Sequence, residues 1–186
     1  MPVKDKSVLI YGHGMDVPFA QRLAREFKRV GYFTPWTSDY PTANDLAVGS
    51  GFDGVERIKD FWKASDEFDL ICFFDVHTAD EAEYLRKHGR LVFAPGCAEI
   101  LELDRYKGRK TQSVVGLPTQ RTELVKGLPH LKQRLSQVKD KYVKLSIFRG
   151  EIESFHHKDF KSSEPYLDKL AVSLGINKDS VDFIFI

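Results

Sequence analysis

Three runs of apolar residues, each followed within two residues by glycine, proline or aspartate, most constrain the fold of this chain. They are S-V-L-I-Y at 7–11, D-L-I-C-F-F at 69–74 and L-V-F at 91–93. Such continuous runs are typical of strands buried on both faces, which occur in parallel sheets covered by helices on both sides. With a further strand expected at 32–36, they predict an α/β fold: a Rossmann-like domain with a mostly parallel sheet.

The segment after the first apolar run predicts a loop and then a helix. Gly12, His13 and Gly14 form the loop, Asp16 is a suitable N-cap, and apolar residues at helical spacing predict a helix that Gly31 ends. One interpretation of the loop is a cradle for phosphate or another ligand, and the other is a tight turn. The third glycine of a G-x-G-x-x-G motif is replaced by valine, so a dinucleotide site is poorly supported.

An acidic residue, Asp75, follows the apolar run at 69–74. Ligands of doubly wound sheets bind at the carboxyl ends of the strands, so Asp75 joins the glycine loop as a candidate for substrate binding. An equal alternative is that Asp75 caps the helix predicted at 78–88. Another helix is predicted at 55–65. Its inward-facing residues are expected to be Ile58, Phe61 and Trp62.

The character of the chain changes after the strand at 91–93. A helix that is first amphipathic and then strongly basic is predicted at 97–115, and a hairpin at 141–155. We therefore place a boundary between a domain at 1–97 and a smaller α+β lobe at 98–186.

The hairpin carries a lysine, Lys144, between Val143 and Leu145, and Arg149 lies in its Arg-Gly turn. A lysine held on a strand beside a glycine turn suits an anionic ligand, because backbone N–H groups and a fixed ammonium face the same place. The alternative interpretation is an edge hairpin with one charged face. The adjacent histidines of the second strand point to opposite faces, so no metal site is predicted.

Composition excludes several classes of protein. The 186 residues are 42% hydrophobic and 30% charged with a formal net charge of +1, so neither nucleic acid nor a membrane is an expected partner. The cysteines, Cys72 and Cys97, have neither the number of a disulfide framework nor the spacing of a zinc site. No signal-peptide pattern opens the sequence. We therefore expect a cytoplasmic protein.

Two groups of short motifs, taken in order, are specific enough to suggest a family. The first group runs from the strand at 91–93 through Ala94-Pro95-Gly96, Leu101-Glu102 and a basic helix to Gly116-Leu117-Pro118-Thr119, and the second is Tyr142-Val143-Lys144. This order resembles the ATP-grasp superfamily, with its G-P-x, L-E-x-x-K, G-(I/L/V)-P-T and V-V-K motifs. The first half looks like the pre-ATP-grasp domain of glycinamide ribonucleotide synthetase. The whole pattern looks most like uncharacterised ATP-grasp proteins of phages and actinobacteria.

The resemblance implies site residues and a reaction. Lys144 would bind nucleotide phosphates, and Arg149 would cap them from the turn. The basic helical position of the family falls on Arg105, with Lys110 as the alternative. The implied cofactors are ATP and Mg²⁺, and the implied substrate is a small carboxylate. The implied enzyme is a carboxylate–amine or carboxylate–thiol ligase that acts through an acyl phosphate.

The resemblance also implies a partial ATP-grasp domain. In the family, the Mg²⁺ ligands belong to a second lobe, downstream of the point that corresponds to Ile186. We therefore expect the C-terminal lobe as a missing partner and no activity from this part alone, and we assign no catalytic residue. The alternatives are a non-catalytic Rossmann-like ligand-binding module and an interaction domain of a larger assembly. A homodimer is left open.

Overall fold

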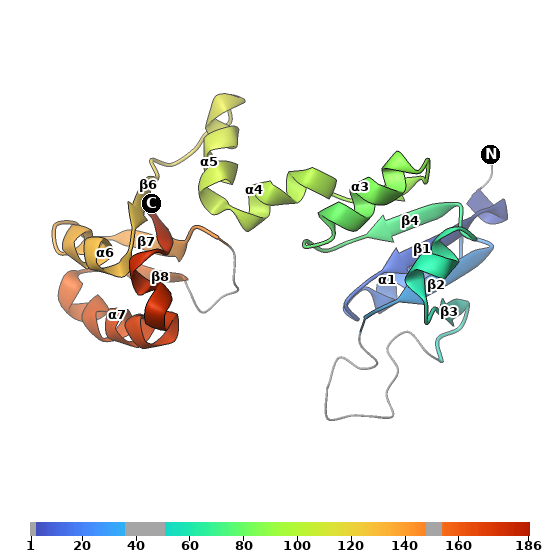
Figure 1. Cartoon of the computed structure of the whole chain (residues 1–186), viewed down its shortest axis with the longest axis horizontal. Coiled ribbons are helices and arrows are strands. Elements are labelled where there is room, and N and C mark those ends of the chain that lie inside the picture. Colours follow the sequence, from blue (N-terminus) through green and yellow to red (C-terminus); the bar gives the residue numbers. More distant parts are fainter. Residues whose placement is uncertain (1–2, 36–50, 148–153) are drawn as a thin grey trace. The chain divides into compact units, whose positions relative to one another are not determined.

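The chain forms two compact units in a computed structural model, Met1–Glu99 and Ile100–Ile186. The structure describes residues 3–35, 51–147 and 154–186 (Figure 1). Among these residues, no helix is both long and apolar enough to cross a membrane.

Five parallel strands form the sheet of the N-terminal unit, in the order β3-β2-β1-β4-β5 (Figure 1). Their bounds are Ser7–Tyr11 for β1, Arg29–Phe33 for β2, Val55–Arg57 for β3, Leu70–Phe73 for β4 and Val92–Phe93 for β5. The two apolar runs that became β1 and β4 are direct neighbours, with Val8 opposite Leu70. The predicted parallel sheet is therefore confirmed.

Helices cover both faces of this sheet, as the sequence predicts. They are α1 (Val17–Leu23), α2 (Phe61–Ser65) and α3 (Ala79–Lys87), with short 3-10 helices at Val3–Asp5 and Gly96–Glu99. Alternate residues of β1 belong to different clusters of buried side chains: Val8 and Ile10 pack with α1, whereas Leu9 packs with α2 and α3. All three are fully buried, which explains why the strand reads as a continuous apolar run.

The prediction of a helix that ends at Gly31 is wrong beyond Leu23. The strand predicted at 32–36 begins earlier than expected, at Arg29. The helix α1 ends at Leu23, and Gly31 lies in the middle of β2. A Cβ atom at Gly31 would come within 2.6 Å of the Phe68 ring and 3.1 Å of the Leu9 side chain. This glycine therefore permits close packing of the strand and does not end a helix.

The helix predicted at 55–65 is also shorter than expected. Residues 55–57 form β3, which pairs in parallel with β2, and α2 begins only at Phe61 after Asp60 caps it. Phe61 is buried, as predicted, but Trp62 is 49% exposed, so the prediction that Trp62 faces inward is wrong. The parallel pairing with β2 outweighs the helical spacing of the sequence.

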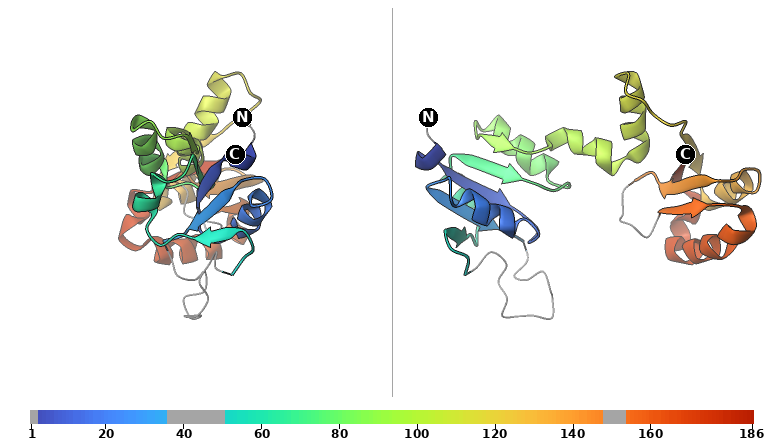
Figure 2. Two further views of the ribbon diagram at one scale, coloured as in Figure 1. Left: turned by 90° about the vertical axis from the view of Figure 1, so that its right-hand side faces the viewer. Right: turned by 180° about the vertical axis from the view of Figure 1, so that it is seen from behind.

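The C-terminal unit is built on a four-stranded antiparallel sheet in the order β6-β9-β7-β8. Its strands are β6 (Glu123–Lys126), β7 (Lys141–Leu145), β8 (Ser154–His157) and β9 (Asp182–Phe185). One face packs on α6 (Leu128–Leu135) and α7 (Phe160–Leu174) through a cluster of buried leucine, valine and phenylalanine side chains. Figure 2 shows α7, in red-orange, along one side of the orange strands β7 and β8.

The hairpin of β7 and β8 lies at one edge of the sheet, as the alternative interpretation expects, with β8 as the edge strand. Lys144 lies on the inner strand, because β7 pairs with both β8 and β9. One expectation for this unit needs correction. The single helix predicted at 97–115 is divided into α4 (Ile100–Leu103) and α5 (Arg105–Val114). The division occurs at Asp104, whose carboxylate caps α5 by accepting a hydrogen bond from the backbone N–H of Lys107.

Candidate functional site

The C-terminal unit contains a basic hollow of about 280 Å³ on the face of its sheet opposite α6 and α7. It is lined by Leu101, Glu102, Arg105, Gly108, Arg109, Gln112, Lys144, Ile184 and Ile186. These residues come from α4, α5, β7 and the C-terminal strand segment. Lys144 and Arg105, two residues expected to contact phosphate, therefore line one hollow.

The alternation of side chains along β7 directs Lys144 into this hollow. Its neighbours Val143 and Leu145 are 1% and 2% exposed and belong to the core formed with α6 and α7. Lys144 points to the other face, where Ile184 of β9 is its register partner. Lys144 therefore lies on the opposite face of β7 from its two apolar neighbours.

Arg105 is held beside the end of β7 by several hydrogen bonds. Its backbone N–H donates to the Ser146 carbonyl over 2.7 Å, and its guanidinium donates to the Leu145 carbonyl over 2.9 Å. The Ser146 hydroxyl donates to Asp104 over 3.1 Å, which connects the cap of α5 to the same strand end. These contacts fix the start of α5 next to Lys144.

Gly108 allows α4 and α5 to approach closely at the hollow. A Cβ atom at this position would lie 2.2 Å from the carbonyl oxygen of Leu101. Backbone cannot yield as a flexible side chain can, so any larger residue would separate the two helices. Gly108 therefore helps to position both Arg105 and Arg109.

The charge of the hollow favours an anionic ligand. Three lining side chains are basic, Arg105, Arg109 and Lys144, and one is acidic, Glu102. Within the described residues, Lys144 has no acidic partner. The apolar lining residues Leu101 and Ile186 add a surface suited to a planar ring, whereas Ile184 is only 1% exposed. Together they can hold a ligand with several anionic oxygens and an apolar part.

The other two residues expected to contact phosphate lie elsewhere. Lys110 lines a different hollow, of about 340 Å³, with Tyr106 and Arg121 among its neighbours. Its ammonium lies 5.8 Å from the centre of the Tyr106 ring. Arg149 lies outside the described residues.

In the N-terminal unit, the loop after β1 and the segment after β4 form a polar cluster at the carboxyl ends of the strands. The Nδ1 atom of His13 lies 3.0 Å from a carboxylate oxygen of Asp75. The backbone N–H of His13 donates to Asp16 over 3.3 Å. Burial raises the pKa of Asp16, and the negative charge of Asp75 adds to the increase. The predicted substrate-binding residues are therefore brought together.

The backbone donors of this loop already have acceptors. The N–H of Gly12 donates to the Phe33 carbonyl over 2.9 Å, and that of Gly14 donates to the Tyr32 hydroxyl over 2.8 Å. The helix that follows, α1, has only seven residues. The loop therefore offers few free donors for a phosphate, and the ligand interpretation rests on its side chains.

The alternative role of Asp75 as a helix cap is wrong. The N-cap of α3 is Thr78, whose backbone N–H donates to the Glu99 carboxylate over 3.1 Å. Asp75 instead accepts from the N–H of Val76 over 2.8 Å and faces His13.

Sequence reasoning missed Tyr32, Arg109 and the two isoleucines of the basic hollow. Tyr32 is fully buried in β2. Because the hydroxyl of a buried tyrosine usually has a hydrogen-bond partner, a tyrosine in a predicted strand next to the glycine loop could have indicated this contact. No local signal identified Ile184, because its position opposite Lys144 depends on strand register.

Among the described residues, no group of three or more histidine, cysteine, aspartate or glutamate side chains is arranged to hold a metal ion. His156 pairs with Asp140 over 2.6 Å, whereas His157 is fully buried against the Ser163 hydroxyl. The two histidines therefore serve separate contacts, and these residues do not fit a Mg²⁺ site.

Comparison with solved structures gives matches over nearly the whole chain. An ADP complex of purK, N5-carboxyaminoimidazole ribonucleotide synthetase, matches with a TM-score of 0.66 and 16% identity over 98% of this chain and 47% of that one. Phosphoribosylamine–glycine ligase from Thermotoga maritima matches with a TM-score of 0.63 and 14% identity over 96% and 43%. A RimK domain ATP-grasp protein from Sphaerobacter thermophilus matches with a TM-score of 0.59 and 13% identity over 95% and 62%.

These similarities establish a fold. The chain has the mixed α/β fold of the N-terminal part of ATP-grasp proteins, as the sequence motifs predict. It spans about half the length of the purK and glycine ligase structures. No family model and no curated protein matches the sequence itself.

Proposed function

We propose that this chain is the N-terminal part of an ATP-dependent ligase that joins a carboxylate to an amine or a thiol through an acyl phosphate. The C-terminal unit would hold the nucleotide in the basic hollow. The observation that supports this most strongly is that Lys144 of β7 and Arg105 of α5 line the same hollow in a unit with the ATP-grasp fold. The similar purK structure was solved with ADP.

The residues of the hollow fit a nucleotide. Lys144, Arg105 and Arg109 would contact phosphate oxygens, because guanidinium and ammonium groups form charge-assisted hydrogen bonds with them. Leu101 and Ile186 would pack against the base. ATP, when bound, would supply the phosphoryl group that activates the carboxylate. We assign Mg²⁺, which the family implies, to none of the described side chains.

The N-terminal unit would bind the acceptor substrate at the ends of β1 and β4. The pairing of His13 with Asp75 fixes the orientation of the imidazole ring, and Asp16 lies beside it. Such a cluster can bind and orient a polar group before reaction. A non-catalytic ligand-binding module would use the same cluster, so nucleotide binding distinguishes the two functions.

The test is ADP binding to the whole chain, measured by isothermal titration calorimetry for the wild type, Lys144→Ala and Lys141→Ala. Lys144→Ala should weaken binding by about 2 kcal/mol, or roughly 30-fold, because one charge-assisted contact is lost. Lys141, on the same strand, lines a different hollow, so Lys141→Ala should bind as the wild type does. Lys144→Met keeps most of the apolar stem and should behave as Lys144→Ala does.

Equal losses in Lys144→Ala and Lys141→Ala would show that ADP responds only to the general charge of the strand. Unchanged affinity in Lys144→Ala, with circular dichroism spectra that match the wild type, would remove the basic hollow as the nucleotide site.

A further inference from the structure

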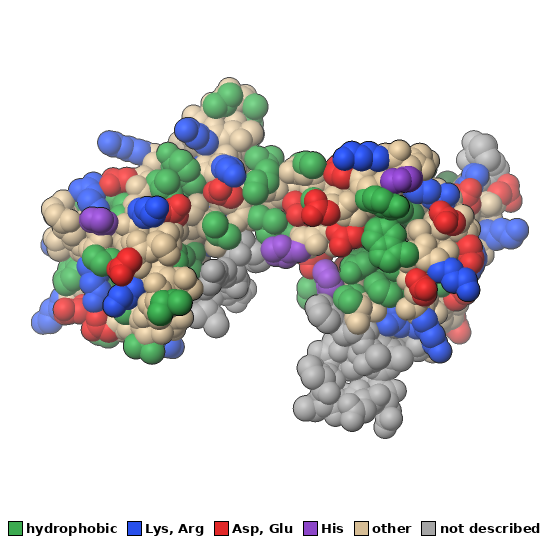
Figure 3. All heavy atoms as spheres, in the orientation of Figure 1, with side chains coloured by type: hydrophobic (Ala, Val, Ile, Leu, Met, Phe, Trp, Pro, Cys, Tyr) green, Lys and Arg blue, Asp and Glu red, His purple; other side chains and the backbone are tan. Residues whose placement is uncertain are grey.

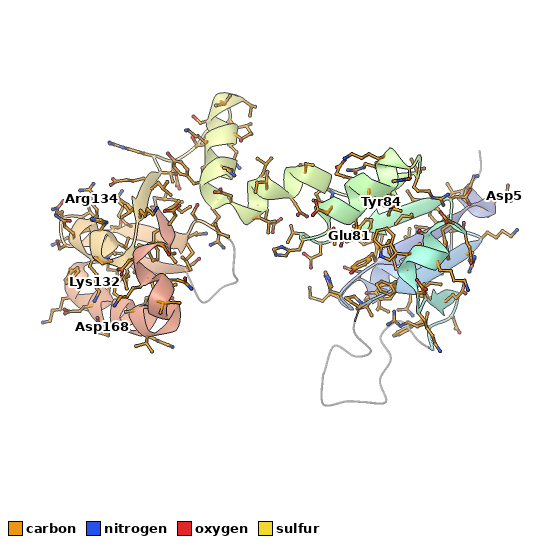
Figure 4. All side chains as sticks on the ribbon, viewed as in Figure 1. Asp5, Glu81, Tyr84, Lys132, Arg134 and Asp168 are labelled. Atoms are coloured by element: carbon orange, nitrogen blue, oxygen red, sulfur yellow. The ribbon has the colours of Figure 1, made fainter. Side chains whose placement is uncertain are left out.

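The N-terminal unit has an aromatic hollow on the face of its sheet covered by α2 and α3. It measures about 510 Å³ and is lined by Trp62, Asp80, Glu81 and Tyr84. Figure 3 shows hydrophobic side chains, in green, gathered on this face, and Figure 4 labels Glu81 and Tyr84 there. None of the four was among the residues expected to bind nucleotide or substrate.

The two aromatic rings are unusually exposed for their size. Trp62 is 49% exposed and Tyr84 is 52% exposed. Their ring centres are 5.5 Å apart with planes at 89°, so the rings form a corner and do not cover each other. His88 packs against Tyr84 with ring centres 4.1 Å apart, and Phe61 packs against Trp62 at 5.2 Å. These neighbours fix the rings and leave the corner open to solvent.

Two carboxylates border this corner without a cationic partner. Within the described part of the chain, neither Asp80 nor Glu81 forms an ion pair. Burial raises the pKa of Tyr11, and the negative charge of Glu81 raises it further. Acidic residues in the first turn stabilise a helix through its dipole, and both belong to the first turn of α3. This effect on helix stability does not explain why two exposed aromatic rings lie beside the carboxylates.

Aromatic faces and unpaired carboxylates together attract one kind of ligand. A cation over a tryptophan or tyrosine ring is stabilised by the negative face of the ring, and the nearby carboxylates add direct attraction. An anion would be repelled by both. The hollow is also within the size range of small-molecule sites.

We propose that the corner formed by Trp62 and Tyr84, with Asp80 and Glu81, binds a small organic cation, an ammonium group carried on an apolar body. The rings would contact the apolar body and the ammonium, and the carboxylates would balance its charge. This site is distinct from the basic hollow and does not rest on the proposed ligase function.

The test uses two probes that are similar in shape and opposite in charge, 2-phenylethylammonium and 3-phenylpropionate. Each is titrated into the whole chain by calorimetry in the absence of nucleotide. The ammonium should bind saturably, and the carboxylate should not. The double variant Asp80→Asn and Glu81→Gln should bind the ammonium about tenfold more weakly. Trp62→Ala should lose binding to a similar or greater extent.

The matched control is Asp5→Asn, another exposed acid of the same unit, which Figure 4 labels away from Glu81. It should bind the ammonium as the wild type does. Absence of ammonium binding to the wild type, or equal binding of the two probes, would overturn the proposal. So would unchanged affinity in the double variant, which removes charge without removing packing.

Discussion

In the N-terminal unit, the polar groups at the strand ends are paired with one another, whereas the hollow of the C-terminal unit gathers three basic side chains and one acid. His13 pairs with Asp75, and the Gly14 N–H pairs with Tyr32. In the C-terminal unit, Lys144 lies among Arg105, Arg109 and Glu102. Internal pairs orient groups before a ligand arrives, whereas an excess of one charge attracts a ligand of the opposite charge.

The largest expected effect tests whether the two units have separate cores. Leu9→Ala and Leu131→Ala each remove a fully buried side chain, from the N-terminal and C-terminal units respectively. Each should lower the free energy of unfolding of its own unit by about 3 kcal/mol, because a cavity remains. Hydrogen exchange measured by mass spectrometry should show loss of protection only in the altered unit. Equal loss in both would mean that one cooperative core joins them.

The next prediction separates the two basic positions on α5. Arg105→Ala should weaken ADP binding about tenfold, near 1.4 kcal/mol, because Arg105 lines the hollow with Lys144. Lys110→Ala should have little effect, because Lys110 lines another hollow. Competition with a fluorescent ADP analogue measures both. A larger loss in Lys110→Ala would assign the phosphate contact to Lys110.

Arg105 also bonds to the Leu145 carbonyl, so its removal can affect stability. Thermal unfolding of Arg105→Ala and of the charge-preserving Arg105→Lys controls for this. Arg105→Lys should recover part of the affinity, because it restores the charge without the bidentate fork.

A smaller effect tests the internal pairing of the N-terminal cluster. Tyr32→Phe removes the acceptor of the Gly14 N–H and should cost about 1 kcal/mol in the free energy of unfolding. Tyr142→Phe is the matched control, because Tyr142 is 56% exposed and should tolerate loss of its hydroxyl. Urea unfolding measures both variants. Equal stability of the two would show that the Tyr32 hydroxyl does not fix the loop.

The smallest effect concerns pH and compares two acids of the N-terminal unit. Burial raises the pKa of Asp16 above its ordinary value of 3.8, so the folded state binds its proton more tightly than the unfolded state does. Relative to Asp16→Asn, the wild type should therefore gain stability as the pH falls from neutral through the folded pKa. Hydrogen bonds from Lys6 and Ser7 hold the pKa of Asp69 well below its usual range.

The stability that Asp69 contributes should therefore change with pH in the opposite direction from that of Asp16. Its stabilisation is present above its unfolded pKa and is lost as the pH falls towards the folded one. Urea midpoints of the wild type, Asp16→Asn and Asp69→Asn between neutral pH and pH ~3 measure both trends. Trends of the same sign would show that the environment of Asp16 differs from the one described.

The sequence predicted the parallel sheet well because burial on both faces produces a local signal. Residues 7–11 and 69–74 are continuous apolar runs, and both became central strands. The predictions were wrong at Gly31 and at Val55. The spacing of apolar residues there predicted helices, but these residues belong to the strands β2 and β3. Strand pairing with residues distant in the sequence decided these segments, and periodicity does not contain that information.

The candidate sites divide in the same way. The sequence by itself determined the types of residue: a strand lysine at Lys144, a basic helix, and histidine and aspartate after buried strands. Only the tertiary structure decided which of them meet. His13 and Asp75 are 62 residues apart in the chain, and Lys144 lies opposite Ile184 through strand register. The physical reason is that local periodicity reports which side of an element is buried, whereas a binding site depends on packing between distant elements.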